Sequence, residues 1–273
     1  MSYRKKHIKS SVRKIKPKRS ILRNRWFWFG VLVLIIVLTA GYFLFFYSGV
    51  QVKDIVISGN QKITNENIVN LVLGNINSKF SRSIFLVNSD DLEKKLLDKF
   101  PEIKNIKVSK EFFHTITVSV AERAPVAVFC PLTGKIGCYF MDADGIIFES
   151  ADEFPQDIVV VRQVAGTGQV SGGSNVIDKN IIDSILKIEK NLKDNFQINL
   201  KEALVKSLVR LDVDTSENWE IYFDTSSDID LQITKLNLLL SSEISDEKRN
   251  NLRYINLIPK SKAIICDNPT CGG

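Results

Sequence analysis

Acidic residues are absent from the first 25 positions of this 273-residue chain, although these positions hold eleven Lys and Arg residues. Charge of either sign is then absent from Trp26 to Tyr47. The rest of the chain holds 26 basic and 31 acidic residues, so its net charge is −5, whereas that of the whole chain is +6. The basic excess therefore belongs to the first segment and does not describe the body of the protein.

The uncharged run is long enough to cross a bilayer as one helix. At ~1.5 Å per residue its 22 positions span roughly 33 Å, against ~30 Å for a hydrocarbon core. It ends in aromatic residues rather than in the small residues of a signal-peptide cleavage site. Trp26, Trp28 and Tyr47 stand where interfacial aromatic belts form. We therefore predict an uncleaved transmembrane helix at residues 26–47.

The flanks of this helix predict its orientation. A basic segment before it and few positive charges just after it place the N-terminus in the cytoplasm. Residues 1–25 then form a basic cytoplasmic tail, and about 225 residues lie outside. Binding of nucleic acid or anionic lipid is an alternative use of the tail. The favoured interpretation is a solvated topology determinant, with no nucleic-acid partner.

Cysteine is scarce, and all four cysteines follow the predicted helix, where disulfides persist. Cys130 and Cys138 flank a segment typical of a hairpin loop, and Cys266 and Cys271 bracket a turn-like segment. No Cys-x-x-Cys pair exists, and His114 is the only histidine after the helix, which disfavours a zinc site. We predict possible disulfides among the four, with their connectivity left open.

The sequence of residues 50–123 predicts five elements in the order strand, helix, helix, strand, strand. A β-rich stretch ends at Ser58 before a Gly-Asn turn, and Thr64 and Ser89 are suited to cap the two helices. Two alternating strands follow Pro101, each with one apolar face. Helices must therefore cover one side of a small sheet.

The following block predicts a mixed sheet with helices on one face. Asp144-Gly145 between apolar runs signals a hairpin, and isoleucines at helical spacing predict a helix at about 177–193. Further predicted elements are strands at 204–213 and 219–223, a helix at 231–240, and strands around 254–257 and 262–265. The last strand is also the last element, so we expect it at the sheet edge; a buried last strand is the alternative.

Several motifs in this order resemble one family. Ala121–Ala127 is similar to the ER-x-P-x-A joint of FtsQ/DivIB cell-division proteins, and residues 50–123 resemble their POTRA domain. Met141–Phe148 is similar to the hDxxGhhF hairpin of that family, and Trp219–Phe223 and Tyr254–Leu257 resemble its closing strands. The resemblance implies an α+β protein with a POTRA-like β-α-α-β-β domain at 50–123, an FtsQ-type β domain at 124–265 and a short tail at 266–273.

The same resemblance implies a non-enzymatic divisome scaffold in the cell membrane, concentrated at the division septum. Such proteins use their last strand to dock an FtsB/DivIC-like and FtsL-like pair by strand addition. The corresponding positions here are Ser261, Lys262, Ala263, Ile264 and Ile265. Asn256 and Ile258 stand where Asp and Arg are typical, and Pro259 removes a backbone donor, so the side-chain details of docking stay open.

Catalytic and ligand motifs are incomplete. Ser184-x-x-Lys187 matches the Ser-x-x-Lys of penicillin-interacting enzymes, but Ser-Asp-Asn and Lys-Thr-Gly companions are missing. The carboxylates at 142 and 144 lack a calcium loop, and the glycines at 166–173 lack a dinucleotide or phosphate-loop pattern. A His114 pairing with Cys130 or Cys138 is formally open. We predict no catalysis, cofactor, metal or small-molecule substrate; the alternatives are a POTRA-bearing assembly or secretion factor and a membrane-anchored wall enzyme.

Overall fold

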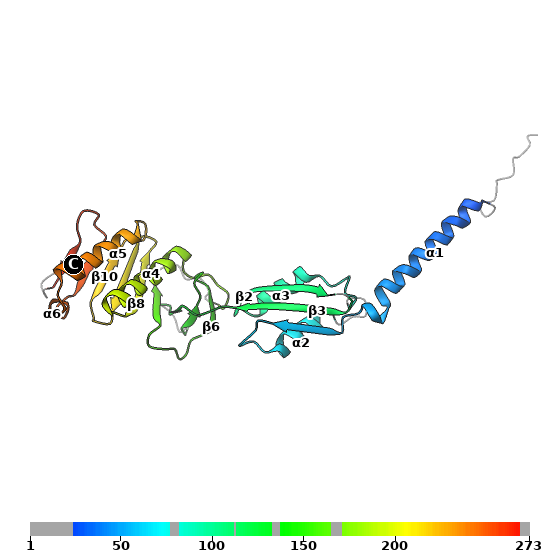
Figure 1. The fold of residues 1–273 in the computed structure, drawn as a ribbon, viewed down its shortest axis with the longest axis horizontal. Helices are drawn as coiled ribbons and strands as arrows, with labels where there is room; N and C mark the ends of the chain where they lie inside the picture. Colours follow the sequence, from blue (N-terminus) through cyan, green and yellow to red (C-terminus); the bar gives the residue numbers. More distant parts are fainter. Residues whose placement is uncertain (1–23, 77–81, 112, 133–136, 165–170, 268–273) are drawn as a thin grey trace, which may run out of the picture.

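The computed structural model describes residues 24–76, 82–111, 113–132, 137–164 and 171–267. Most of the predicted cytoplasmic tail, the glycines at 166–168 and Cys271 lie outside these ranges. The described chain is elongated, with helix α1 at one end, a three-stranded domain in the middle and a nine-stranded domain at the other end (Figure 1).

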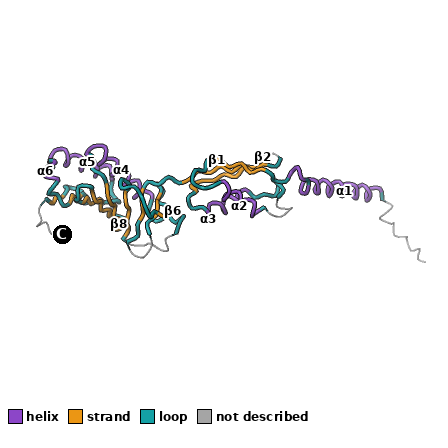
Figure 2. The backbone as a smooth tube through the Cα atoms, turned by 90° about the horizontal axis from the view of Figure 1, so that it is seen from below, coloured by secondary structure: helices purple, strands orange, loops and turns teal. Residues whose placement is uncertain are grey.

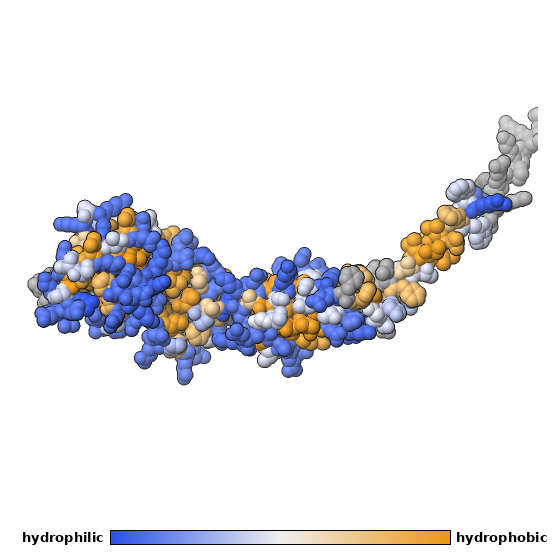
Figure 3. Space-filling view, in the orientation of Figure 1, coloured by the Kyte–Doolittle hydropathy of each residue, from blue (hydrophilic) through white to orange (hydrophobic). Residues whose placement is uncertain are grey.

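Helix α1, Arg25–Phe46, coincides with the uncharged run. The Asn24 side chain begins it by accepting a hydrogen bond from the Trp26 amide at 3.1 Å. None of the Arg25–Phe43 segment is buried against the rest of the protein, and its length and composition suffice to cross a membrane. Figure 3 shows apolar residues along the middle of this helix, with hydrophilic residues near its start. A short 3₁₀ turn, Ser48–Val50, connects it to the first domain.

The three-stranded domain has the predicted element order. Its elements are β1 (Asp54–Ser58), α2 (Asn65–Asn75), α3 (Ser89–Lys99), β2 (Ile103–Glu111) and β3 (Thr115–Glu122). The strand order is β1-β3-β2, with β1 parallel and β2 antiparallel to β3. Both helices cover one face (Figure 2), and Ile68 and Leu96 pack there against the sheet residues Ile116 and Val118.

The two predicted helix caps of this domain differ from the structure in detail. Thr64 occupies the N-cap position of α2, but its side chain makes no capping hydrogen bond. The cap of α3 is Asn88 rather than Ser89, because the Asn88 side chain accepts from the Asp91 amide at 3.3 Å. Ser89 is the first helical residue. Both residue types cap well, so the sequence alone did not separate them.

The nine-stranded domain is a mixed sheet in the order β12-β11-β10-β9-β8-β7-β4-β5-β6. Its strands are β4 (Ala127–Phe129), β5 (Tyr139–Met141), β6 (Ile147–Ser150), β7 (Val159–Gln163), β8 (Leu200–Ser207), β9 (Arg210–Thr215), β10 (Glu220–Phe223), β11 (Tyr254–Asn256) and β12 (Ile264–Cys266). Its helical segments are α4 (Lys179–Phe196), α5 (Ile229–Leu238), the π-helical turn η3 (Leu239–Glu243) and α6 (Asp246–Arg249). Helices α4 and α5 lie on one face of the sheet (Figure 2).

One predicted strand is wrong. The stretch 204–213 is not a single strand but the hairpin of β8 and β9, with its turn at Leu208 and Val209. These two side chains are 78% and 53% exposed. The turn was missed because two apolar residues occupy it in place of the Gly, Asn or Asp that usually signals a tight hairpin.

The structure joins Cys130 and Cys138 by a disulfide between the end of β4 and the start of β5. Cys130 packs in a small second core with Val128 and Ala151, and Phe140 lies against it. Cys266 is also disulfide-bonded, and its predicted companion Cys271 lies outside the described residues.

Removing the first disulfide is expected to destabilise the nine-stranded domain. Closing a loop of sequence separation 8 restricts the unfolded chain by roughly 2.5 kcal/mol. Cys130→Ala/Cys138→Ala should lower the free energy of urea unfolding of the detergent-solubilised chain by about that amount. The disulfide at Cys266 is present in both proteins, so the difference between their unfolding free energies reports the loss of the Cys130–Cys138 bond. An unchanged unfolding midpoint would contradict the expectation.

Candidate functional site

Two places in the described chain gather functional groups: the joint between the two domains, and the edge strand β12. The joint begins at Glu122, the last residue of β3. Its carboxylate accepts backbone N–H groups of Gln61, Lys62 and Ile63 at 2.8, 3.0 and 3.0 Å. Partial burial raises the pKa of Glu122, but the three amides outweigh it, so that the pKa is lowered overall. The carboxylate thereby fixes the turn that leads into α2.

The next residue, Arg123, crosses to the other domain. Its Nη1 lies 2.5 Å from Asp142 Oδ2, and its Nε donates to the Pro101 carbonyl at 3.0 Å. The two paired side chains are only 12% and 3% exposed. The other oxygen of Asp142 accepts from the amides of Asp144 and Ile146, and so it shapes the β5–β6 turn. Asp142 therefore stabilises the turn and binds the neighbouring domain with one carboxylate.

The turn itself requires glycine. Gly145 has φ of +76°, and a Cβ there would lie 2.0 Å from the Ile177 carbonyl oxygen. Such a backbone conformation is open to glycine but strained for other residues. The Asp-Gly signal in the sequence is thus explained by both the turn and the close approach of the segment before α4.

Three lysines complete the joint. Asp144 accepts from Lys104 of β2 at 2.7 Å and from Lys179 of α4 at 2.5 Å. These bonds, the one from Lys104 first, lower the pKa of Asp144 to about 2. Lys62 pairs with Glu149 of β6 at 2.7 Å. The joint therefore has buried charges at its centre and exposed ion pairs around them.

The lowered pKa of Asp144 predicts a stability change in acid. A carboxyl whose pKa is about 2 in the folded protein and about 3.9 in the unfolded chain stabilises the fold above the latter value. This contribution is lost as pH falls from about 4 to about 2. Thermal unfolding should show a larger loss across that window for the wild type than for Asp144→Asn. Parallel curves for the two proteins would contradict this expectation.

Strand β12 lies at one end of the nine-stranded sheet, and among the described residues it pairs only with β11. The docking strand was predicted at Ser261–Ile265, but the observed strand begins at Ile264, so Ser261, Lys262 and Ala263 precede it. Strand β11 runs parallel to β10, whereas β12 runs antiparallel to β11. The chain must therefore reverse its direction between β11 and β12. It does so through bends at 259–261, where Lys235 Nζ donates to the Lys260 carbonyl at 2.7 Å.

The sheet face opposite the helices carries an aromatic row that leads to this edge. Tyr222 stacks on Tyr254 with ring centroids 5.2 Å apart, and the Arg210 guanidinium lies 4.9 Å from the Tyr222 ring centre. Burial raises the pKa of Tyr222, which stays neutral at physiological pH. In the strand register, Tyr222 is followed by Asn256 and then by Ile264, which is 42% exposed.

The catalytic alternatives gain no support from their contacts. Ser184 Oγ donates to the Asn180 carbonyl of its own helix at 2.7 Å, and Lys187 pairs with Asp230 at 2.9 Å. His114 contacts Asp54 in the three-stranded domain at 3.1 Å, whereas Cys130 and Cys138 form a disulfide. Within the described ranges, no group of three His, Cys, Asp or Glu side chains is placed to hold a metal ion.

The contacts of Arg123 and Asp142 were missed at the sequence level. Both residues lie in motifs that the sequence singled out, but nothing in their spacing shows that the two motifs touch. Lys104 and Lys179 carried no signal at all, since a lysine on a strand or at a helix start is usually solvated.

Comparison with known proteins supports the order of elements. A family model described as "POTRA domain, FtsQ-type" matches residues 50–123. The chain is 38% identical over 58 residues to the cell division protein FtsQ of Geobacter sp. (strain M21). This similarity covers 21% of the chain, and it spans about a fifth of the length of that relative.

Proposed function

We propose that this chain, which its FtsQ-type POTRA domain and its FtsQ relative support as an FtsQ/DivIB family cell-division protein, is a non-enzymatic scaffold of the division machinery. In this proposal α1 anchors it in the cell membrane with the N-terminus in the cytoplasm, and the two domains lie outside. The nine-stranded domain recruits small single-span division proteins of the FtsB/DivIC and FtsL type by strand addition at β12.

The observation that carries the proposal is the position of β12. A strand at a sheet edge exposes N–H and C=O groups that another chain can pair with. Among the described residues nothing pairs with the outer side of β12. The strand also lies at the end of the molecule farthest from α1 (Figure 1). A partner anchored in the same membrane then needs an extended or helical stem to reach it.

The joint supports the same function by setting that distance. Glu122 fixes the three-stranded domain and Arg123 fixes the nine-stranded domain, through adjacent residues of one chain segment. With both held, the edge strand stands at a defined distance from the three-stranded domain, which follows α1 in the chain. A scaffold that aligns other anchored proteins benefits from such a fixed spacing.

Photocrosslinking in dividing cells tests the proposal. A photoreactive residue at Lys262 or at Ile264 should capture a small single-span protein with a coiled-coil segment. The matched control is Leu208, which is 78% exposed in the β8–β9 turn of the same domain and should not capture that protein. Absence of such an adduct from both edge positions, or equal capture from Leu208, would count against strand addition at β12.

A further inference from the structure

The end of the three-stranded domain that adjoins α1 is built from three neighbouring chain segments (Figure 1). One of them directly follows the short turn after α1, and its backbone is bonded on both sides. On one side the Ile84 amide donates to the Val50 carbonyl at 3.0 Å. On the other side the Lys53 amide donates to the His114 carbonyl at 2.9 Å. The turns that hold Ile84 and His114 therefore flank the point where the chain leaves α1.

The turn around Ile84 presents apolar side chains to the solvent. The amides of Leu86 and Val87 donate to the Ser83 carbonyl at 2.9 and 3.2 Å, which closes the turn. Ile84 and Val87 are buried in the core of the domain, whereas Phe85 and Leu86 are 45% and 37% exposed. The two buried side chains thus anchor the turn, and the two residues between them are left on the surface.

The other turn is the tip of the β2–β3 hairpin, and it is apolar as well. Phe113 lies there and is 59% exposed. Thr115, the first residue of β3, pairs in register with Asp54, the first residue of β1. The hairpin tip therefore extends past the start of β1, on the side of α1. Both exposed phenylalanines of the described part of this domain lie at its α1 end.

The chain between α1 and this end of the domain is short. Helix α1 ends at Phe46, and the Val50 carbonyl already accepts from Ile84 of the domain. The linker of four residues, 47–50, spans at most about 14 Å when fully extended. Three of its residues form the tighter 3₁₀ turn Ser48–Val50. With α1 in the membrane, the bilayer surface is therefore within reach of both turns.

The charges around the two turns are balanced. The exposed basic residues here are Lys53, Arg82 and Lys110, and the exposed acidic residues are Asp54, Asp90 and Glu111. Their formal charges cancel, so a contact at this end depends on the apolar side chains rather than on net charge. A zwitterionic lipid surface is then sufficient as the partner.

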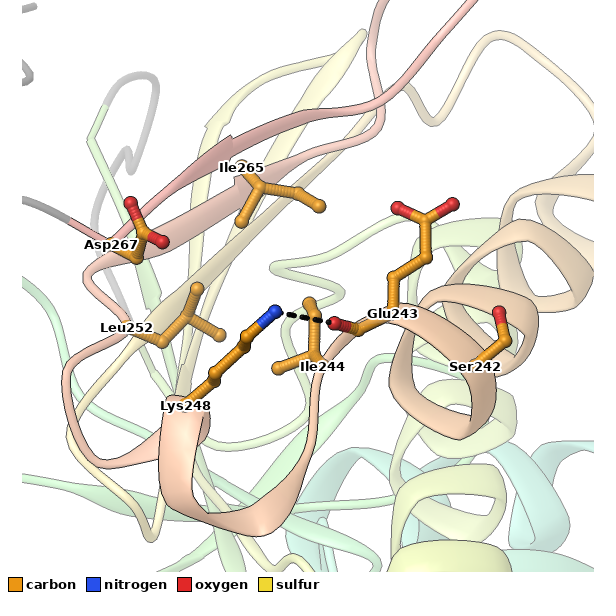
Figure 4. A pocket seen from close by; sticks show the side chains of 7 residues that line it. All are labelled: Ser242, Glu243, Ile244, Lys248, Leu252, Ile265 and Asp267. Atoms are coloured by element: carbon orange, nitrogen blue, oxygen red, sulfur yellow. Dashed lines mark hydrogen bonds between the residues drawn. The ribbon is translucent and has the colours of Figure 1, made fainter.

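The far end of the molecule has a different surface. Figure 4 shows a pocket of about 510 Å³ there, between β12 and the segment before α6. Lys248 lies in it and donates to the Glu243 carbonyl at 3.4 Å, and the carboxylates of Glu243 and Asp267 stand around it. Charged groups of this kind are stable in water and costly to bring into lipid. This fits the position of the pocket at the end farthest from α1.

We propose that the two turns lie in the headgroup layer of the bilayer that α1 spans, with Phe85, Leu86 and Phe113 inserted; this rests on the function proposed above. Clustered exposed apolar side chains mark contacts with proteins or membranes, and Phe and Leu side chains bury at the boundary of headgroups and acyl chains. The membrane is the occupant because the short linker brings it to this end without any other partner. The domain then rests on the bilayer instead of swinging on its linker.

Quenching by labelled lipids tests the contact with the full-length chain. A bimane label is attached at Leu86→Cys, and the protein is reconstituted into phosphatidylcholine vesicles whose headgroups carry a nitroxide quencher. The described native cysteines are disulfide-bonded, so the added thiol takes the label. The lipids should quench this label strongly.

Leu97→Cys is the matched labelling site. Leu97 is 39% exposed, but it lies near the other end of α3, about 12 Å along the helix from its first residue. A label there should stay close to its fluorescence in vesicles without the quencher. The difference between the two sites measures how closely the α1 end of the domain approaches the lipid.

Removing the two phenylalanines separates the contact from the tether. Phe85→Ser/Phe113→Ser in the chain labelled at position 86 should reduce the quenching to the level found at position 97. Leu97→Ser in the same labelled chain removes an apolar side chain of similar exposure outside the turns, and it should leave the quenching unchanged. Thermal unfolding verifies that each variant is folded.

The possible failures are distinguishable. Equal quenching at positions 86 and 97, or quenching that persists without the two phenylalanines, overturns the contact while the anchoring by α1 stands. A label at position 86 that is shielded from aqueous iodide but not quenched by the lipids shows a protein chain over the turns, which overturns the contact too. Release of the chain from the vesicles by alkaline carbonate overturns the anchoring itself.

Discussion

Replacing Arg123 by Ala is expected to lower the free energy of unfolding by about 3–5 kcal/mol, as for other buried ion pairs that lose one partner. The variant leaves the carboxylate of Asp142, 3% exposed, without its counter-charge. It also leaves the Pro101 carbonyl without the donor at 3.0 Å. Urea unfolding of the detergent-solubilised chain, followed by circular dichroism, measures the change.

Two further variants are compared with Arg123→Ala, to separate the effect of the buried ion pair from that of an exposed pair and from that of charge alone. Lys62→Ala removes an ion pair at the same joint whose side chains are 59% and 38% exposed, and it should cost only about 0–1 kcal/mol. Arg123→Lys keeps the charge but loses the forked donor that reaches both Asp142 and Pro101, so an intermediate cost is expected. If Arg123→Ala were as mild as Lys62→Ala, the joint would not depend on the buried pair.

The same variant should also loosen the angle between the domains. Spin labels at Val56 on the edge strand of one domain and at Leu208 on the other occupy exposed positions. Their distance distribution should be narrow in the wild type and broad in Arg123→Ala. A broad distribution in the wild type would show that the ion pair does not hold the domains together.

Local patterns predicted the three-stranded domain well because each of its elements carries its own signal. Its strands alternate, its helices have one apolar stripe, and Gly59 ends the first strand with φ of +85°. A Cβ at Gly59 would lie 2.1 Å from the Val120 carbonyl oxygen, so the glycine is a tertiary requirement as well as a turn signal. In this region local propensity and packing agree.

The elements that sequence reasoning missed depend on contacts between distant segments. The β8–β9 turn is held by Thr225 rather than by a turn-forming residue type: its side chain donates to the Leu208 carbonyl at 2.7 Å, and its amide donates to the Val209 carbonyl. The start of β12 depends on a loop held by Lys235. The Arg123–Asp142 pair joins residues 19 positions apart in two domains. None of these contacts leaves a periodic trace in the sequence.

Trp219→Ala is expected to cost about 3–5 kcal/mol and to disturb the edge strand β12, the proposed docking site, more than the rest of the protein. Trp219 is 1% exposed and immediately precedes β10. Its indole N–H donates to Glu217 at 3.0 Å, and the neighbouring Glu220 amide donates to Arg253 just before β11. The side chain belongs to the same buried core as Ile221 of β10 and Ile255 of β11, the strand with which β12 pairs.

Leu96→Ala is the matched control, because Leu96 is fully buried in the separate core of the three-stranded domain. It should cost about 2–5 kcal/mol as well, but amide exchange should then increase in β2 and β3 rather than in β11 and β12. Under the proposed docking at β12, photocrosslinking of the partner from Ile264 should accordingly fall in Trp219→Ala and persist in Leu96→Ala. An equal loss of crosslinking yield in both variants would mean that the edge strand depends on the stability of the whole chain. The two substitutions destabilise the chain by similar amounts, so only a local effect at β12 would make their yields differ.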